Sequence, residues 1–153
     1  MRWKGFGQTL TDDGHRVYFS GKPDRHEEGV CFLVHRDISK TIIGCQPISS
    51  RIISIRLRSA PFNVTVMQVY APTSGHSDDE VEEFYQQVQE TIDKTPRSDI
   101  LIIQGDWNAK VGRYTQWSGI CGPFCINTTN NRGLRLLEFA TPNDIILTST
   151  LAP

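Results

Sequence analysis

The most constraining feature of the sequence is an apolar run that leads into a glycine and two polar residues. Residues 98–111 read Ser-Asp-Ile-Leu-Ile-Ile-Gln-Gly-Asp-Trp-Asn-Ala-Lys-Val. The β-branched run at 100–103 predicts a strand buried on both faces, in the middle of a sheet. Gly105 then allows a turn or a close approach of the backbone to a ligand. If the chain stays extended there, Asp106 and Asn108 project from the same side.

Asp106 and Asn108 are suited to chemistry on oxygen ligands. A carboxylate can bind a hard cation or orient a water, and a carboxamide offers an acceptor and two donors to a phosphate oxygen or a nucleophile. The alternative is a strand that ends in an ordinary turn, because Gly, Asp and Asn are common turn residues. The stretch alone leaves both interpretations open.

Alternating apolar and polar residues in the first half of the chain predict hairpin-linked antiparallel strands. In one of them Ile53, Ile55 and Leu57 share a face and Ser54, Arg56 and Arg58 share the other. Residues 1–15 and 112–130 are rich in turn residues and are predicted to be irregular. The expected strands are Val17–Ser20, Gly29–His35, Thr41–Cys45, Arg51–Arg58 and 64–70.

Two helices and a final strand are predicted in the second half. Ser77-Asp78-Asp79-Glu80 fits a capping box, and apolar residues then recur at helical spacing as far as Ile92. This helix should cross from one strand to the next, because Pro96 and the apolar run at 100–103 follow it. A second helix around 134–139 should end before Pro142, and 144–150 reads as a strand. The order predicts a layered α/β domain with a mixed sheet.

Length and composition narrow the class of protein. A chain of 153 residues is expected to form one domain around one core. It has no run near the roughly 20 apolar residues that span a bilayer and no signal-peptide pattern, so we expect no membrane partner and an intracellular protein of the nucleus or cytoplasm, not a secreted one. Its four cysteines are therefore expected to be reduced.

The charge distribution argues weakly against nucleic acid. Residues 1–58 carry ten Lys and Arg against six Asp and Glu, a net +4, and residues 59–153 carry six against eleven, a net −5. The basic footprint typical of strong DNA binders is missing from these totals. These totals do not exclude DNA binding, because metal ions between carboxylates and phosphates remove the need for a basic surface.

Two motifs resemble those of a known superfamily. Gly105-Asp106-Trp107-Asn108 resembles the Gly-Asp-aromatic-Asn signature of the endonuclease/exonuclease/phosphatase superfamily, and Val69-Tyr70-Ala71-Pro72 resembles its strand that ends in Tyr-Ala-Pro. From Arg2-Trp3 onward the chain is similar to the endonuclease of RTE-type non-LTR retrotransposons and to the craniofacial development protein 2-like proteins. The resemblance implies that residues 1–153 are a single partial domain, a DNase I-like layered β-sandwich of α+β type with flanking helices.

The resemblance also implies a chemistry: magnesium-dependent cleavage of DNA phosphodiesters. It assigns catalytic roles to Asp106, Asn108 and Tyr70, with Asp106 also a ligand of Mg²⁺; a core tyrosine is the alternative for Tyr70. The superfamily's metal-binding Glu stands before the position of Arg2, and its His-Asp pair stands after Pro153. None of the histidines here is in a comparable context, and each is expected to be a surface or loop residue: His15, His26, His35 and His76.

These departures predict impaired nuclease activity and self-association through exposed sheet edges. Two alternatives to a nuclease stay open. One is a non-catalytic remnant that acts as an interaction module, and the other is a phosphatase of the same superfamily.

Overall fold

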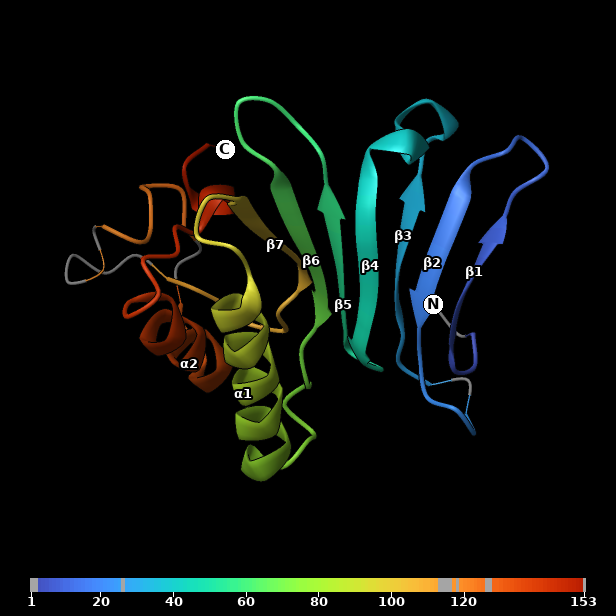
Figure 1. Ribbon diagram of the computed structural model, residues 1–153. Helices are drawn as coiled ribbons and strands as arrows, with labels where there is room; N and C mark the ends of the chain where they lie inside the picture. The colour runs from blue at the N-terminus through green and yellow to red at the C-terminus, as the bar shows by residue number, and fades with distance from the viewer. Residues whose placement is uncertain (1–2, 26, 113–116, 118, 126–127, 153) are drawn as a thin grey trace. The chain divides into compact units, whose positions relative to one another are not determined.

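The computed structural model describes residues 3–25, 27–112, 117, 119–125 and 128–152 (Figure 1). These residues cluster into two compact units, 1–71 with 78–106 and 72–77 with 107–153. Arg2 and His26 lie outside the described residues. The single domain expected from the length of the chain stays a prediction.

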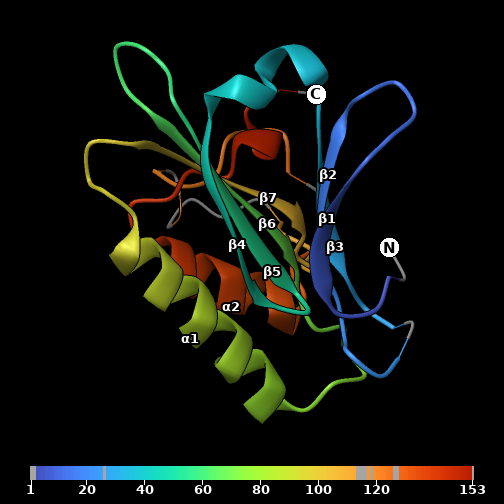
Figure 2. The same ribbon diagram turned by 45° about the vertical axis from the view of Figure 1, so that its right-hand side comes forward.

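The first unit contains two β-sheets that face each other, with a helix on the outer face of the second sheet (Figure 2). The first sheet is antiparallel and the second is mixed, because its last two strands run parallel. The 3₁₀ helix η1 (Arg36–Thr41) joins the sheets, and helix α1 (Asp78–Lys94) connects the parallel strands. The first sheet has the order β1 (Phe6–Leu10), β2 (Arg16–Ser20), β3 (Val30–Val34); the second has the order β4 (Ile42–Ser49), β5 (Ile52–Leu57), β6 (Val64–Tyr70), β7 (Ile100–Asp106).

Alternate residues of β3 and β5 form the core between the sheets. Val30, Phe32 and Val34 on β3 pack with Ile53 and Ile55 on β5, and each of these side chains is at most 8% exposed. Burial of one such side chain away from water contributes about 1.5–3 kcal/mol to the stability of the fold. The predicted apolar face of residues 51–58 is thereby confirmed.

The other face of the second sheet packs toward α1. On β6, Met67 and Val69 are completely buried, while Val66 points the opposite way, into the core between the sheets. Helix α1 begins directly after the predicted capping serine and buries one face, formed by Val81, Phe84, Tyr85 and Val88. The predicted crossover helix is confirmed.

Residues 100–103 form a strand, as predicted, but the prediction that it lies in the middle of a sheet is wrong. Among the described residues β7 pairs only with β6, and Ile100 and Ile102 are 50% and 44% exposed. The strand covered on both faces is β6. A short apolar run is compatible with a central strand and with an edge strand, because the local sequence does not determine how many neighbouring strands it pairs with.

Two further predictions fail. Residues 1–15 were expected to be irregular, but Phe6–Leu10 forms β1, an exposed edge strand whose Gly and polar residues lack the usual strand pattern. Residues 144–150 were expected to be a strand, but Leu147 makes one isolated bridge to Cys121, and Thr148–Thr150 forms the 3₁₀ helix η3.

The second unit contains helix α2 (Asn131–Ala140), which confirms the second predicted helix. The Asn130 side chain caps it by accepting a hydrogen bond from the backbone N–H of Gly133 at 2.8 Å, and it also accepts one from the backbone N–H of Lys110, outside the helix, at 3.0 Å. Leu136, Leu137 and Ala140 are buried along one face of the helix, and Phe139 is buried as well. None of the helices in the described part of the chain is long and apolar enough to cross a membrane.

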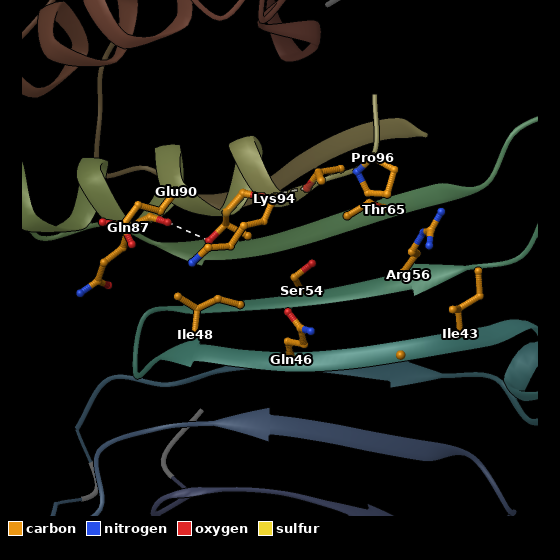
Figure 3. A pocket seen from close by; sticks show the side chains of 13 residues that line it. Ile43, Gln46, Ile48, Ser54, Arg56, Thr65, Gln87, Glu90, Lys94 and Pro96 are labelled. Carbon is orange, nitrogen blue, oxygen red and sulfur yellow. Dashed lines mark hydrogen bonds between the residues drawn. The ribbon is translucent and has the colours of Figure 1, made fainter. Parts of the chain in front are cut away.

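A cavity of about 410 Å³ lies on the α1 side of the second sheet. Figure 3 shows Ser54, Arg56 and Thr65 on the sheet and Gln87 and Lys94 on the helix around it. The polar side chains of β5 therefore lie on the face opposite the core, as their alternation predicts.

An ion pair at this face joins three parts of the second sheet. Arg56 on β5 donates from Nε and Nη2 to the two carboxylate oxygens of Asp99 at 2.7 and 2.9 Å, and Thr65 Oγ1 on β6 donates to Asp99 Oδ2 at 2.8 Å. The Asp99 side chain has no exposed surface. Hydrogen bonds from Arg56 and then Thr65 hold the pKa of Asp99 below its usual value, against the effect of desolvation.

Replacing Asp99 with Asn should lower the free energy of unfolding at neutral pH. It should also make that free energy less dependent on pH in the acidic range. A carboxyl whose pKa is lower in the folded than in the unfolded protein stabilises the fold above its unfolded pKa, and this stabilisation is lost as the pH falls through the folded pKa. The native protein should therefore lose stability from about pH 4 downward, and Asp99→Asn should lose less. Urea unfolding at a series of pH values measures this.

The exposed Asp12 provides the control, since Asp12→Asn should keep the native pH dependence. An Asp99→Asn variant with the native dependence would contradict the role given to the ion pair.

Candidate functional site

Two of the three predicted site residues come together at the end of the parallel pair β6–β7. Tyr70 and Asp106 are the last residues of these strands and stand opposite each other in register. The backbone N–H of Ala71 donates to the carbonyl oxygen of Asp106 at 2.8 Å. Residues in register on parallel strands point to the same face, so the phenol and the carboxylate emerge on one side of the sheet.

Gly105 allows the two strands to meet closely at this end. Its φ is +136°, a region that side chains rarely adopt, and a Cβ atom there would collide with the carbonyl oxygen of Val69 on β6. The glycine was expected to allow a turn or a close approach to a ligand. The close approach is to the neighbouring strand.

Asn108, the third predicted residue, belongs to the second unit. β7 ends at Asp106 and Asn108 has φ +48°, so the extended conformation that would align these two side chains does not persist. The condition for that alignment is therefore not met, because Asn tolerates the left-handed region and ends the strand. Between them Trp107 lies 6.5 Å from the ring of Phe139 on α2, centroid to centroid, within the second unit.

Arg51 anchors Tyr70 from the neighbouring hairpin. Its guanidinium lies over the Tyr70 ring, with Cζ 5.5 Å from the centroid, and Nη1 donates to the Tyr70 carbonyl oxygen at 3.2 Å. The Arg51 carbonyl oxygen accepts from the Tyr70 N–H at 2.9 Å. Two of these contacts fix the Tyr70 backbone, and the cation–π contact holds the guanidinium against one face of its ring.

Glu28 in turn holds Arg51. Glu28 Oε1 accepts from Arg51 Nη2 at 2.7 Å and from Lys22 Nζ at 2.9 Å, and Oε2 accepts from Ser50 Oγ at 2.8 Å. The side chains of Glu28 and Arg51 are each only 12% exposed. Desolvation raises the pKa of Glu28, but the hydrogen bonds from Lys22 and Ser50 and the charge of Arg51 outweigh it, so the pKa lies below its usual value.

This network does not follow from the motifs of the sequence, although the position of Arg51 carries a signal for it. Arg51 stands two residues before Ile53 and so falls in phase with the apolar face of β5. A buried charge of this kind needs a partner. Nothing in the local sequence indicates that the partner is Glu28, which has φ +59° in the connection before β3.

The described histidines and cysteines give no sign of a second centre. His15 and His35 stack at 4.5 Å between ring centroids, and His76 Nδ1 lies 2.9 Å from Thr73 Oγ1 in a loop. The described cysteines are free thiols, and burial raises the pKa of Cys45 to about 11. Within the described ranges no group of three or more His, Cys, Asp or Glu residues could hold a metal.

The first unit therefore offers one exposed carboxylate and a phenol beside a partly buried arginine, and the second unit carries the Asn108 carboxamide. The carboxylate can bind a hard cation, and the phenol and carboxamide can donate to phosphate oxygens.

Comparisons with known proteins agree with the resemblance of the motifs. No family model matches the chain. Over 151 residues it is 41% identical to craniofacial development protein 2 of Bos taurus and 39% identical to that of Tragulus javanicus, and each alignment covers 99% of this chain. The alignments cover 25% and 26% of those proteins, so the chain spans about a quarter of their length.

Among solved structures, the chain matches the endonuclease domain of TRAS1, a telomere-specific non-LTR retrotransposon. The TM-score is 0.54 and the sequence identity 18%, over 82% of this chain and 52% of that one. The likeness shows a shared fold. The expected layered DNase I-like architecture is confirmed.

Gly105→Ala should destabilise the first unit. The added methyl group collides with the Val69 carbonyl oxygen, and Ala is strained at φ +136°, so we expect a loss of about 2 kcal/mol or more in the free energy of unfolding. Urea unfolding followed by circular dichroism measures it. Gly44→Ala, where the added atom meets nothing within 4 Å, is the control and should change little. Equal effects of the two substitutions would contradict the close approach at Gly105.

Glu28→Gln should also lower the free energy of unfolding, by about 1–3 kcal/mol at neutral pH, because it removes a charged acceptor from Arg51 and Lys22. The neighbouring Glu27 is exposed, and Glu27→Gln should be neutral. Urea unfolding of both variants provides the measurement. A neutral Glu28→Gln would show that the network does not stabilise this end of the sheet.

Proposed function

Because this chain is homologous over 151 residues to craniofacial development protein 2 and has the fold of a retrotransposon endonuclease domain, we propose that it is a magnesium-dependent DNA endonuclease module. The observation that carries the proposal is the pairing of Tyr70 with Asp106 at the ends of two adjacent parallel strands. The reaction would be hydrolysis of a phosphodiester bond.

Each proposed role follows from the chemistry of the side chain. Asp106 is exposed and would bind Mg²⁺ together with waters and a substrate phosphate, as Mg²⁺ usually does when the protein supplies one or two carboxylates. Tyr70, held by Arg51, would donate to a phosphate oxygen. Asn108 would position a phosphate oxygen or the attacking water. Positioning and charge neutralisation are the main requirements of phosphoryl transfer.

With only these three site residues, we expect the 153-residue chain to cleave DNA slowly. One carboxylate holds Mg²⁺ weakly, and none of the three residues is the histidine that most often serves as a general base. The single carboxylate also favours the alternative function, a non-catalytic interaction module. The partner in the proposed function is DNA, and the proposed location is inside the cell.

Nicking of supercoiled plasmid by the purified protein tests the proposal. We expect slow nicking that requires Mg²⁺ and stops with a chelator. Asp106→Asn should reduce the rate on the order of 100-fold, the effect typical of removing one group that stabilises transition-state charge. Asp12→Asn, an exposed carboxylate on the connection between β1 and β2, should leave the rate unchanged.

Two results would overturn the proposal. Nicking that persists in Asp106→Asn would remove the proposed site. No nicking by native protein that is folded by circular dichroism would favour the interaction module. A phosphomonoester substrate in parallel distinguishes a phosphatase, which should hydrolyse it faster than it nicks plasmid.

A further inference from the structure

Two histidines form a cross-strand pair at one end of the first sheet. Arg16 of β2 and Val34 of β3 are the last residues in register on these antiparallel strands, so His15 and His35 stand opposite each other one position further along. Their rings stack with 4.5 Å between centroids and 37° between planes. His15 follows the turn between β1 and β2, and His35 is the residue directly before η1, which leads to the second sheet.

Each ring accepts a hydrogen bond from the first turn of η1. His15 Nδ1 accepts from the backbone N–H of Arg36 at 3.1 Å, and His35 Nδ1 accepts from the backbone N–H of Asp37 at 3.3 Å. The first N–H groups of a helix have no acceptor within the helix, so the two imidazoles supply acceptors that the backbone lacks. The bond to His15 joins the β1–β2 hairpin to η1, and both lie at the same end of the sheets (Figure 1).

These bonds require both rings to be neutral. A backbone N–H can only donate, so each Nδ1 must be an acceptor and the ring proton must be on Nε2. A protonated imidazole has an N–H on both nitrogens and accepts no hydrogen bond. Protonation of both rings would also place two positive charges on rings 4.5 Å apart, beside N–H groups that already carry partial positive charge. The same bonds disfavour a metal ion between the rings, because an Nε2 that carries the proton cannot be a ligand.

One nearby carboxylate can compensate the protonation of His35. Asp37 Oδ2 lies 3.4 Å from His35 Nδ1, so a charged ring can exchange its backbone partner for an ion pair. The other oxygen of this carboxylate lies 3.9 Å from Arg36 Nε, and Lys40 stands in the last turn of η1. A charged His35 therefore shares its carboxylate with an arginine.

His15 lacks this compensation. Within the described part of the chain it forms no ion pair, and Asp12 and Asp13 are exposed in the turn before it. The group that η1 brings to this turn is a cation, because Arg36 Nη1 donates to the Asp13 carbonyl oxygen at 3.4 Å. Arg16, the next residue, points to the opposite face of β2. A charge on His15 therefore removes its hydrogen bond without adding an ion pair.

We propose that His15 and His35 form a pH-sensitive latch between the β1–β2 hairpin and η1. The latch is closed while both rings are neutral and His15 is bonded to Arg36, and it opens when both rings are protonated. The closed state binds fewer protons than the open state, so a fall in pH favours opening. The latch responds below neutral pH, because histidine is the side chain that ordinarily changes charge between about pH 5 and 8.

Opening acts at the end of the sandwich away from the candidate site. η1 leads into β4 at Ile42, which pairs with Leu57, and Leu57 pairs with Val64 at the beginning of β6. Tyr70 and Asp106 stand at the other ends of their strands. We therefore expect mild acid to loosen η1 and the tip of the β1–β2 hairpin and to leave the candidate site in place.

Hydrogen exchange of the Arg36 amide, followed by NMR at about pH 7.5 and about pH 5, tests the latch in the native protein. After correction for the intrinsic effect of pH, exchange should be about 2- to 10-fold faster at the lower pH, which corresponds to the loss of one hydrogen bond. At the higher pH, the imidazole ¹⁵N shifts of His15 and His35 should place the proton on Nε2. Both pH values are above the range in which Asp99 is expected to lose its charge.

Two substitutions separate the hydrogen bond from the ring. His15→Asn keeps an acceptor in the position of Nδ1 but cannot be protonated, so the Arg36 amide should stay protected at both pH values. His15→Phe keeps the ring but has no acceptor, so the amide should exchange at the faster rate at both. The control is His76→Asn, in a loop of the second unit, which should keep the native response.

The latch is ruled out by a native Arg36 amide whose corrected exchange rate is the same at both pH values. This comparison needs no variant, so it decides the question even where a substitution prevents folding. Circular dichroism shows which variants are folded. A folded His15→Asn variant with the native response, or a His15→Phe variant as protected as the native protein at the higher pH, would also contradict the proposal.

Discussion

The structure depends on the apolar contact between β3 and β5. Val30, Phe32 and Val34 meet Ile53 and Ile55, and this contact holds the two sheets face to face. Because successive side chains of a strand alternate, the same contact places Thr65, Met67 and Val69 of β6 on the opposite face, toward α1. β6 is thus packed on both faces and supports β7 as its parallel neighbour.

The candidate site follows from that parallel pairing. Parallel strands need a crossover, which α1 supplies, and their carboxyl ends then meet at one edge. Tyr70 and Asp106 stand together there because Gly105 lets the two backbones approach. Arg51 and Glu28 link this edge to the connection before β3, so the sandwich itself restrains the phenol. The proposed chemistry and the fold therefore rest on the same contacts.

The alternation of residues 51–58 was enough to predict which of their side chains face the core, and the capping pattern at Ser77 predicted where α1 begins. The motifs around Tyr70 and Asp106 identified the two residues that the fold brings together. These features are local, because the period of a strand or helix is carried by neighbouring residues. The edge position of β7, the strand β1 and the partnership of Glu28 with Arg51 were decided only in three dimensions. They depend on pairings between segments far apart in the chain, which an apolar run or a single charge does not encode.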